Sequence, residues 1–267
     1  MNDAALELVE ADGYAEMFRA APDSVRRAHG VDVCEVVGAT CILLGAVPGQ
    51  LMLNRVNGLG LRGRVGDVHL DEIDAFFRAG GTQYAIGVSP LAPPDLAPRL
   101  AERGFQPGYA WMKFRRGVEP PPEVETTLRV DQVGRDRAGA FGAIVARGFG
   151  LPDFAGEWFA AVAERPRFRL FLAYDGDEPA GAGALFVGDG VGWLGAAATL
   201  PEHRRKGAQG AILAARIRVA RELGLRAFAT ETGERTADRP SGSYRNILRL
   251  GFEEQYLRPN YVSPAGA

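Results

Sequence analysis

Apolar runs alternate with amphipathic segments along the whole chain. Runs rich in Val, Ile and Leu predict strands, whereas apolar residues three or four positions apart predict helices. Gly and Pro stand at the ends of many of these segments and predict where they stop. In the first half the pattern predicts helices at 4–20, 70–79 and 94–103, a strand pair or bent strand at 33–47, and strands at 51–56, 82–88 and 105–115.

The second half repeats the alternation. The predicted helices are 133–149, 154–163, one ending at Leu223, and 243–250, and the predicted strands are 168–174, 180–187, 193–199, 226–232 and 252–261. Together the two halves predict an α/β (α+β) fold, in which each half is a mixed, mostly antiparallel sheet flanked by helices. The charged segment Arg116–Thr126 contains three consecutive prolines, which favour an extended, stiff chain. We therefore expect domains at 1–118 and 126–267.

A short echo links the two halves. Arg103–Phe105 is followed by Tyr109, and Leu250–Phe252 is followed by Tyr256 with the same spacing. In each case a helix is expected to stop at Gly, and an aromatic residue opens the next strand. The order of elements before each echo also agrees, which predicts a tandem pair of related domains.

One stretch of the second half has the pattern of a phosphate site. The apolar strand Trp193–Thr199 is followed by Pro201 and by the basic turn Arg204–Gly210, after which a helix begins. The free N–H groups and the dipole of a helix N-terminus favour an anion. Gly207 and Gly210 allow the backbone to come close to a ligand.

The turn sequence PEHRRKGAQGAIL resembles motif A of the GNAT superfamily of acetyl-CoA-dependent N-acyltransferases. Arg204 and Gly207 match the first two anchors of that motif, whereas Gln209 stands where Gly or Ala is usual. The resemblance covers roughly residues 125–262. The first half has no such turn before a helix, so we interpret it as a degenerate GNAT-like domain without the cofactor motif.

The resemblance implies where acetyl-CoA would be held. The pyrophosphate should meet the turn amides, and the pantetheine arm should pair with the end of the preceding strand. The start of the helix after the next strand should supply further contacts. The expected cofactor-binding residues are Ala198, Thr199, Leu200, Arg204, Arg205, Lys206, Gly207, Ala208, Gln209, Gly210, Ser243 and Asn246.

Amine acetylation also needs proton transfer. Glu231 lies in the apolar or small run AFATETG, and a carboxylate there is costly unless it is hydrated or paired. It is the predicted base, the alternative being a residue on an exposed face or against an arginine. Many relatives have a Tyr four residues before the Gly of LGF, but Ile247 stands there. Tyr244 and Tyr256 are the candidate acids.

A second glycine-rich segment, Gly58–Gly63, matches the pattern G-x-G-x-x-G after a strand. A dinucleotide site also needs a helix that opens at the third glycine and an acidic residue at the end of the next strand. Here the helix is expected near Leu70, and Glu72 and Asp74 fall inside it. The better interpretation is a flexible loop.

Composition limits the remaining classes. The formal net charge of −2 gives no overall basic field for nucleic acid. Two cysteines and three scattered histidines are too few for a disulfide framework or a metal cluster. No apolar run approaches the roughly 20 residues of a membrane span, and no signal peptide opens the chain. We expect a cytoplasmic protein with no metal and no membrane partner, assembled as a homodimer.

Two functions follow from these observations. The first is an N-acetyltransferase that moves an acetyl group from acetyl-CoA to a primary amine of a small molecule or peptide. The second is a non-catalytic acyl-CoA-binding or interaction module. The basic turn and Glu231 favour the enzyme, whereas Ile247 and the degenerate first half favour the module.

Overall fold

The computed structural model describes residues 4–236 and 241–265, and the chain forms two compact units. Unit 1 contains the residues up to Arg19, Asp23–Met112, and those from Tyr256 onward, and unit 2 contains Ala20–Pro22 and Lys113–Gln255. Strands β5 (Gln106–Arg116) and β11 (Glu253–Val262) each begin in one unit and end in the other. Each unit is therefore formed by segments from both halves of the sequence.

Unit 1 is built around short strands that follow a helix pair. Its elements are α1 (Ala4–Arg19), α2 (Asp23–His29), β1 (Val31–Val36), β2 (Ala39–Leu44), β3 (Arg55–Asn57), α3 (Asp67–Ala79), β4 (Ala85–Gly87) and α4 (Leu96–Glu102). The strand order is β1-β2-β3-β4-β11-β5. Strands β1, β2 and β3 are antiparallel neighbours, whereas β3 and β4 are parallel and are joined through α3.

The core of unit 1 lies on both faces of β2, where every residue is buried. Cys41 and Leu43 belong to a cluster that includes Ile73 and Phe77 of α3. Because successive strand residues point to opposite faces, Ile42 and Leu44 face the other side, where α1 packs against β2. A strand covered on both sides reads as a continuous apolar run, which explains the strong signal of residues 39–44.

Unit 2 has the longer strands. Its further elements are β6 (Arg129–Val133), α5 (Ala138–Gly148), α6 (Phe154–Ala161), β7 (Phe168–Asp175), β8 (Glu178–Val187), β9 (Val191–Thr199), α7 (Ala208–Glu222), β10 (Ala227–Gly233) and α8 (Gly242–Arg249), with 3₁₀ turns at Arg135–Arg137, Val162–Glu164 and Pro201–His203. The strand order is β5-β10-β9-β8-β7-β6. Strands β6 to β9 are antiparallel, and β9 and β10 are parallel.

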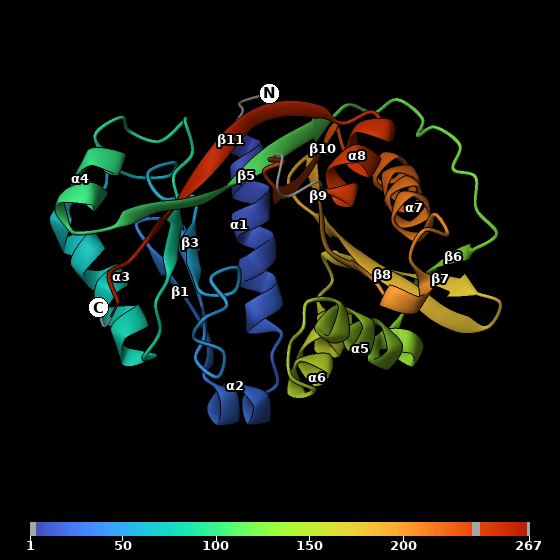
Figure 1. The fold of residues 1–267 in the computed structure, drawn as a ribbon, viewed down its shortest axis with the longest axis horizontal. Helices are drawn as coiled ribbons and strands as arrows, with labels where there is room; N and C mark the ends of the chain where they lie inside the picture. Colours follow the sequence, from blue (N-terminus) through green and yellow to red (C-terminus); the bar gives the residue numbers. More distant parts are fainter. Residues whose placement is uncertain (1–3, 237–240, 266–267) are drawn as a thin grey trace. The chain divides into compact units, whose positions relative to one another are not determined.

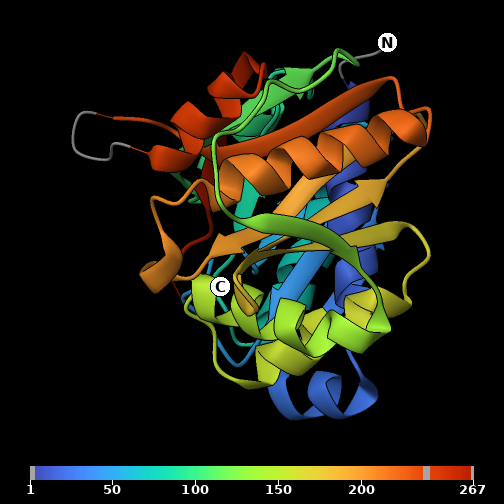
Figure 2. The ribbon, with the colours of Figure 1, turned by 90° about the vertical axis from the view of Figure 1, so that its right-hand side faces the viewer.

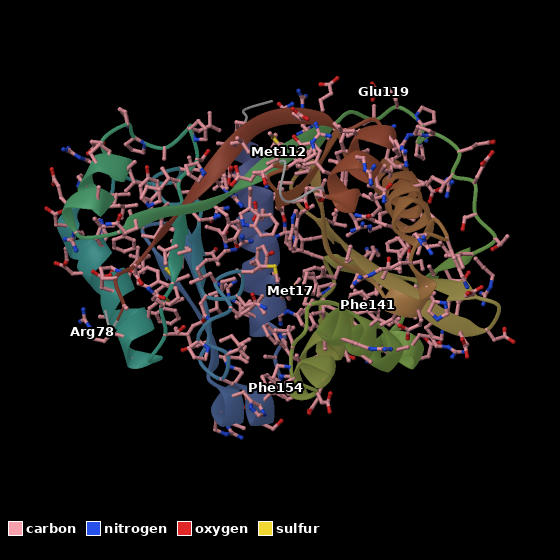
Figure 3. All side chains as sticks on the ribbon, in the orientation of Figure 1. Met17, Arg78, Met112, Glu119, Phe141 and Phe154 are labelled. Atoms are coloured by element: carbon pink, nitrogen blue, oxygen red, sulfur yellow. The ribbon has the colours of Figure 1, made fainter. Side chains whose placement is uncertain are left out.

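Helix α7 and the pair α5–α6 cover opposite faces of the unit 2 strands (Figure 1). A Cβ at Gly181 or Gly183 would lie 3.2 or 2.7 Å from Ile212 of α7, and one at Gly148 of α5 would lie 2.3 Å from Ala198. Figure 2 shows α7 running across the strands. On the other side, Phe141 of α5 is fully buried, and Figure 3 marks its place in unit 2.

Strand β9 carries a bulge. Ala182 faces Ala198 and Ala184 faces Gly195, so two residues of β9 oppose one residue of β8. Ala196, inside the bulge, has a φ of +46°, a conformation that L-residues rarely adopt. A β-bulge bends its strand and frees backbone groups from the ladder.

The guanidinium of Arg216, on α7, is buried against this bulge. Its Nη1 donates to the carbonyl oxygens of Ala184, at 2.9 Å, and Gly195, at 3.1 Å. Arg216 is 1% exposed, and burial lowers the pKa of its guanidinium to about 9. The group therefore stays charged near neutral pH, and its donors satisfy carbonyls at the irregular part of the ladder.

The same connectivity occurs in both units, and the expected mixed α/β architecture is confirmed. In each unit a helix pair precedes three antiparallel strands, a helix, a strand parallel to the third, a further helix and a long strand. Strands β1, β2, β3 and β4 of unit 1 thus correspond in topology to β7, β8, β9 and β10 of unit 2.

Several local predictions differ from the structure. The strand expected at 51–56 is reduced to β3 (Arg55–Asn57), and turns precede it. The helix expected at 133–149 begins at Ala138, after β6 and Gly134. Strand β6, with the sequence RVDQV, has no buried residue, so it has little of the apolar signal that identifies strands. The short helix α2 has a single buried residue, Val25, and was not predicted for a similar reason.

The proline-rich segment is held along unit 2. Arg116 donates to the carbonyl oxygens of Gly117, Glu119 and Pro120, at 3.0, 2.6 and 2.9 Å. Arg221 of α7 donates to the carbonyl oxygen of Val118 at 2.6 Å. The segment is thus an ordered strap, and a division of the chain into domains at this place remains a prediction. Among the described residues, no helix is both long and apolar enough to cross a membrane.

Replacement of Arg216 tests its contribution to unit 2. Arg216→Ala leaves two carbonyls without their donor and opens a cavity, so we expect unfolding free energy to fall by about 2–4 kcal/mol. Arg218→Ala on the same helix removes an exposed cation and should change stability by less than about 0.5 kcal/mol. Urea denaturation followed by tryptophan fluorescence measures both. Equal stability of the two variants would show that the buried hydrogen bonds of Arg216 do not stabilise unit 2.

Candidate functional site

Strands β9 and β10 separate at one end of unit 2. Their parallel ladder joins Val191–Trp193 to Ala227–Ala229, whereas the strands continue to Thr199 and Gly233. Beyond the ladder, the Thr230 hydroxyl donates to the carbonyl oxygen of Leu194 at 2.9 Å. The bulge in β9 follows directly, so this edge of β9 presents backbone groups that can pair with an extended ligand.

The chain then enters α7 through a basic turn. Gly207 is the N-cap of α7, with φ +87°, and Arg205 also has a positive φ, +66°. A Cβ at Gly207 would lie 3.0 Å from Thr126 Cβ and 3.1 Å from the carbonyl oxygen of Glu125. Both the conformation and the space thus require glycine. No side chain caps the helix start, so its backbone N–H groups can donate to an anion.

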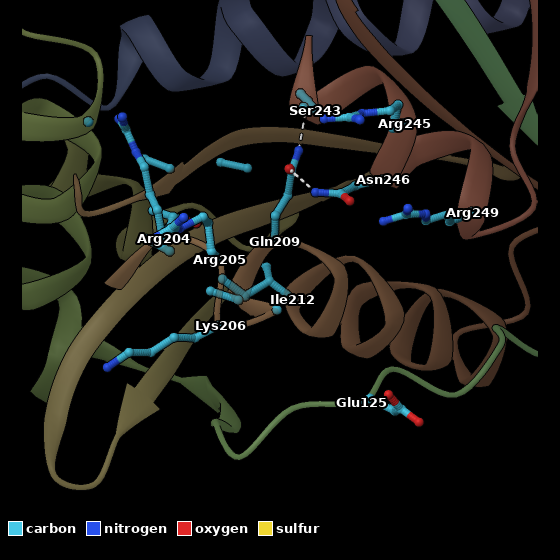
Figure 4. A pocket seen from close by; sticks show the side chains of 18 of the residues that line it. Glu125, Arg204, Arg205, Lys206, Gln209, Ile212, Ser243, Arg245, Asn246 and Arg249 are labelled. Carbon is cyan, nitrogen blue, oxygen red and sulfur yellow. Dashed lines mark hydrogen bonds between the residues drawn. The ribbon is translucent and has the colours of Figure 1, made fainter. Parts of the chain in front are cut away.

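A cavity of about 1020 Å³ lies at this turn. Its walls come from the bulged end of β9, the basic turn, the first residues of α7, the start of α8 and the strap residues Glu125 and Thr127. Figure 4 shows the side chains of α7 and α8 facing one another across it. It is large enough for a ligand of cofactor size.

Gln209 joins the two helices inside this cavity. Its Nε2 donates to Ser243 Oγ at 2.7 Å, and its Oε1 accepts from Asn246 Nδ2 at 2.8 Å (Figure 4). Where the resembling motif has a small residue, this chain therefore has a polar bridge between α7 and α8. The bridge leaves the backbone N–H groups of the turn unchanged.

Most of the predicted cofactor residues come together here. Those that line the cavity are Ala198, Thr199, Arg204, Arg205, Lys206, Gly207, Ala208, Gln209, Ser243 and Asn246. Leu200 and Gly210 are buried beside it and are not part of its wall. Gly210 instead packs against Val124 of the strap, which a Cβ there would approach to 3.3 Å.

The comparison with known proteins agrees with this geometry. Residues 145–240 match the family model described as Acetyltransferase (GNAT) family. The chain carries a GNAT-family domain. The matched residues contain β9, the basic turn, α7 and β10.

Solved structures show that the GNAT fold extends over more of the chain. A GCN5-related N-acetyltransferase from Kribbella flavida is 19% identical, with a TM-score of 0.66, and the match covers 97% of this chain and 95% of that one. One from Sphaerobacter thermophilus is 15% identical, with a TM-score of 0.61 over 97% and 93%. A tandem GNAT protein from the clavulanic acid biosynthesis pathway is 17% identical, with a TM-score of 0.56 over 80% and 75%. No curated protein sequence matches the chain.

Lys206 lies in the GNAT turn, but its ammonium points to a carboxylate of the same domain. It pairs with Asp175, whose Oδ2 also lies 3.0 Å from His203 Nδ1. Lys206 first and His203 second hold the pKa of Asp175 below its usual range. The side chain of Lys206 is thus used within the protein, whereas its main chain borders the cavity.

Glu231 lies on β10 beyond the point where β9 and β10 separate. Its carboxylate accepts from Trp193 Nε1 at 3.0 and 3.1 Å, and Lys113 Nζ lies 3.3 Å from Oε2. The carboxylate and Lys113 are 6% and 1% exposed. Trp193 in turn covers Gly195, where a Cβ would lie 2.2 Å from the indole ring. The carboxylate thus sits beside the bulge and is paired with a buried lysine, whereas the alternative interpretation named an exposed position or an arginine partner.

The two candidate tyrosine acids have different surroundings. Tyr244, on α8 in unit 2, donates its hydroxyl to Glu254 at 2.7 Å. Tyr256 belongs to unit 1, where its hydroxyl donates to Glu7 at 2.9 Å. Burial, followed by Glu7, raises the pKa of Tyr256. Neither hydroxyl borders the cavity, and Ile247 is buried as a packing residue.

Sequence reasoning missed two cations of the site. Arg245 and Arg249 line the cavity from α8, and their spacing of four places them on one face of a helix. The strap residues Glu125 and Thr127 were also missed. The Thr126 hydroxyl donates to the Lys206 carbonyl at 2.6 Å and so holds the strap beside the basic turn. No local sequence pattern encodes this contact between distant residues.

The corresponding loop of unit 1 is closed by its own side chains. Residues 58–63 connect β3 to α3, as the basic turn connects β9 to α7. Leu59 is buried, and a Cβ at Gly60 would lie 2.6 Å from Pro93. Helix α3 begins with Asp67, which pairs with Arg99 at 2.7 Å. A carboxylate at the helix start repels phosphate, which argues against a nucleotide site in this loop.

The protonation of Tyr244 can be measured. Burial, followed by Glu254, raises its pKa from 10.0 to about 12. The folded protein therefore keeps this proton more firmly than the unfolded chain, and the resulting stability is complete below pH 10 and lost as the pH rises towards 12. In a titration of tyrosinate absorbance, Tyr244→Phe should remove one step near pH 12. Loss of a step near pH 10 instead would contradict the environment described here.

Proposed function

We propose that the chain is an N-acetyltransferase that moves the acetyl group of acetyl-CoA to a primary amine of a small molecule or a peptide. One observation carries the proposal: β9 and β10 separate directly beside an uncapped, basic helix start. An extended arm and an anionic end group of one ligand would fit these two features. The tandem GNAT protein among the structural matches supports a reading of unit 1 as a second, cofactor-free domain.

The donors of the cavity fit such a ligand. Its wall contains Arg204, Arg205, Arg245 and Arg249, and the start of α7 offers backbone N–H groups for a pyrophosphate. The free edge of β9 near Ala198 and Thr199 offers backbone partners for the amides of a pantetheine arm. Asn246 adds an amide at the same wall.

When bound, acetyl-CoA would supply a thioester carbonyl that an amine attacks, so that a C–N bond forms and the C–S bond breaks. The amine must reach this step neutral, although a lysine-like amine has a pKa of about 10.4. Glu231 would accept the amine proton, directly or through water. Tyr244, which belongs to the same unit and keeps its proton at neutral pH, would return a proton to the sulfur, although its hydroxyl lies outside the wall of the cavity.

A non-catalytic acyl-CoA-binding module is the second candidate. The observation that favours it is the pairing of Glu231 with Lys113 and Trp193, because an ammonium and an indole N–H both stabilise the ionised carboxylate. Ile247, which stands where many relatives have a tyrosine, also favours the non-catalytic module. Release of free thiol from acetyl-CoA across a panel of amines separates the two candidates.

Both candidate functions require CoA to bind at the basic turn, and this requirement can be tested by itself. Arg204→Gln removes an exposed cation of the turn, and we expect CoA affinity, measured by calorimetry, to fall about tenfold, or by about 1.4 kcal/mol. Gly207→Asp should weaken it further, because a side chain there meets Thr126 and adds negative charge. Unchanged CoA affinity in both folded variants would overturn the site.

Glu231 is tested by removing its charge. If it is the base, Glu231→Gln should lower kcat roughly 10²–10⁴-fold and remove the acidic limb of the pH profile, with CoA affinity little changed. If it only balances Lys113, the same variant should instead lose about 3–5 kcal/mol of stability. Adding Lys113→Met separates the two effects, because it would restore stability and leave the catalytic loss. Full turnover with an unchanged pH profile in the double variant would refute the assignment.

A further inference from the structure

The cations that line the cavity at the basic turn form two groups. The turn group is Arg204 and Arg205, and the helix group is Arg245 and Arg249 of α8. All four side chains are exposed. Figure 4 shows Arg245 and Arg249 extending from α8 towards the cavity, on the side of Gln209 opposite to Arg204 and Arg205.

A neutral bridge separates the groups. Gln209 lies between them and uses both ends of its amide on Ser243 and Asn246. The bridge places two positive regions at separate points of one wall. A ligand that complements them would carry two separate anionic groups.

The positive charge is not balanced within the described part of the chain. Among the residues that the structure describes, none of the four arginines forms an ion pair, whereas the fifth cation of the wall, Lys206, is paired with Asp175. The carboxylate among the wall residues is that of Glu125, on the strap. Arg245 and Arg249 are like charges four positions apart, an arrangement that destabilises a helix slightly. An anion between them would reverse that effect.

The chemistry of CoA supplies this second anion. Its pyrophosphate and its 3′-phosphate are separate groups, joined through the adenosine ribose. Resting on the proposed function, we propose that Arg245 and Arg249 bind the 3′-phosphate, while the turn group and the start of α7 bind the pyrophosphate. Arginine suits a phosphomonoester because its planar fork can donate two parallel hydrogen bonds. The protein would therefore select CoA thioesters over ligands that lack this phosphate.

Calorimetry with CoA and 3′-dephospho-CoA tests the assignment. The wild-type protein should bind CoA at least about tenfold more tightly than dephospho-CoA. In the Arg245→Gln/Arg249→Gln variant this ratio should fall to within about twofold of one, because only CoA loses a contact. The affinity for dephospho-CoA should stay the same, and this also shows that the variant is folded.

Two matched variants sharpen the result. Arg204→Gln should weaken both ligands equally, because both carry the pyrophosphate. Arg218→Gln removes an exposed cation of α7 outside the cavity and should change neither affinity. Equal binding of the two ligands by the wild type, or an unchanged ratio in the double variant, would overturn this inference and leave the proposed function intact. Binding of neither ligand by the wild type would overturn the proposed function itself.

Discussion

The buried guanidinium of Arg216 is the contact on which the site depends most. It supplies donors to Ala184 and Gly195, at the place where the bulge disturbs the ladder between β8 and β9. Burial of a charge is unfavourable when no carboxylate is among its described contacts. The hydrogen bonds from the guanidinium to the two carbonyls offset part of this unfavourable free energy. The bulge in turn turns the end of β9 away from regular pairing, next to the point where β10 separates. The packing of Arg216, on α7, thereby determines the backbone conformation at the end of β9, which a ligand would contact.

The two units show how one connectivity can support different chemistry. In unit 2 the helix after the third antiparallel strand opens with a glycine in a left-handed conformation and exposed arginines. In unit 1 the corresponding helix opens with Asp67, and Leu59 and Pro93 fill the loop before it. The backbone connections agree, so the difference lies in side-chain charge and volume at the helix start. Fold alone therefore does not assign a phosphate site, and the site proposed in unit 2 rests on the residues at the helix start.

The sequence predicts the parts of this protein whose signals are local. The apolar runs of β2 and β8, and the turn Arg204–Gly207, are recognisable because burial on both faces and a glycine at positive φ constrain nearby residues. Strand β6 escaped prediction because its side chains are not buried. The partners of Glu231 also escaped it, since Lys113 is 118 positions away in the chain. Such contacts depend on how strands assemble, and no periodicity records them.

Gln209 shows how a departure from a family pattern can still suit the site. The small residue usual at its place allows the backbone to approach a ligand, and a larger side chain would hinder that approach if it pointed into the turn. Here it points to α8 and is held at both ends, by Ser243 and Asn246. Because Asn246 donates its Nδ2 to this bridge, its own carbonyl oxygen is left as the acceptor that can face a ligand. An amide N–H of an extended arm is the group that such an acceptor would favour. Gln209 therefore fixes the orientation of Asn246 and links α7 to α8, while the backbone amides of the turn stay available to a ligand.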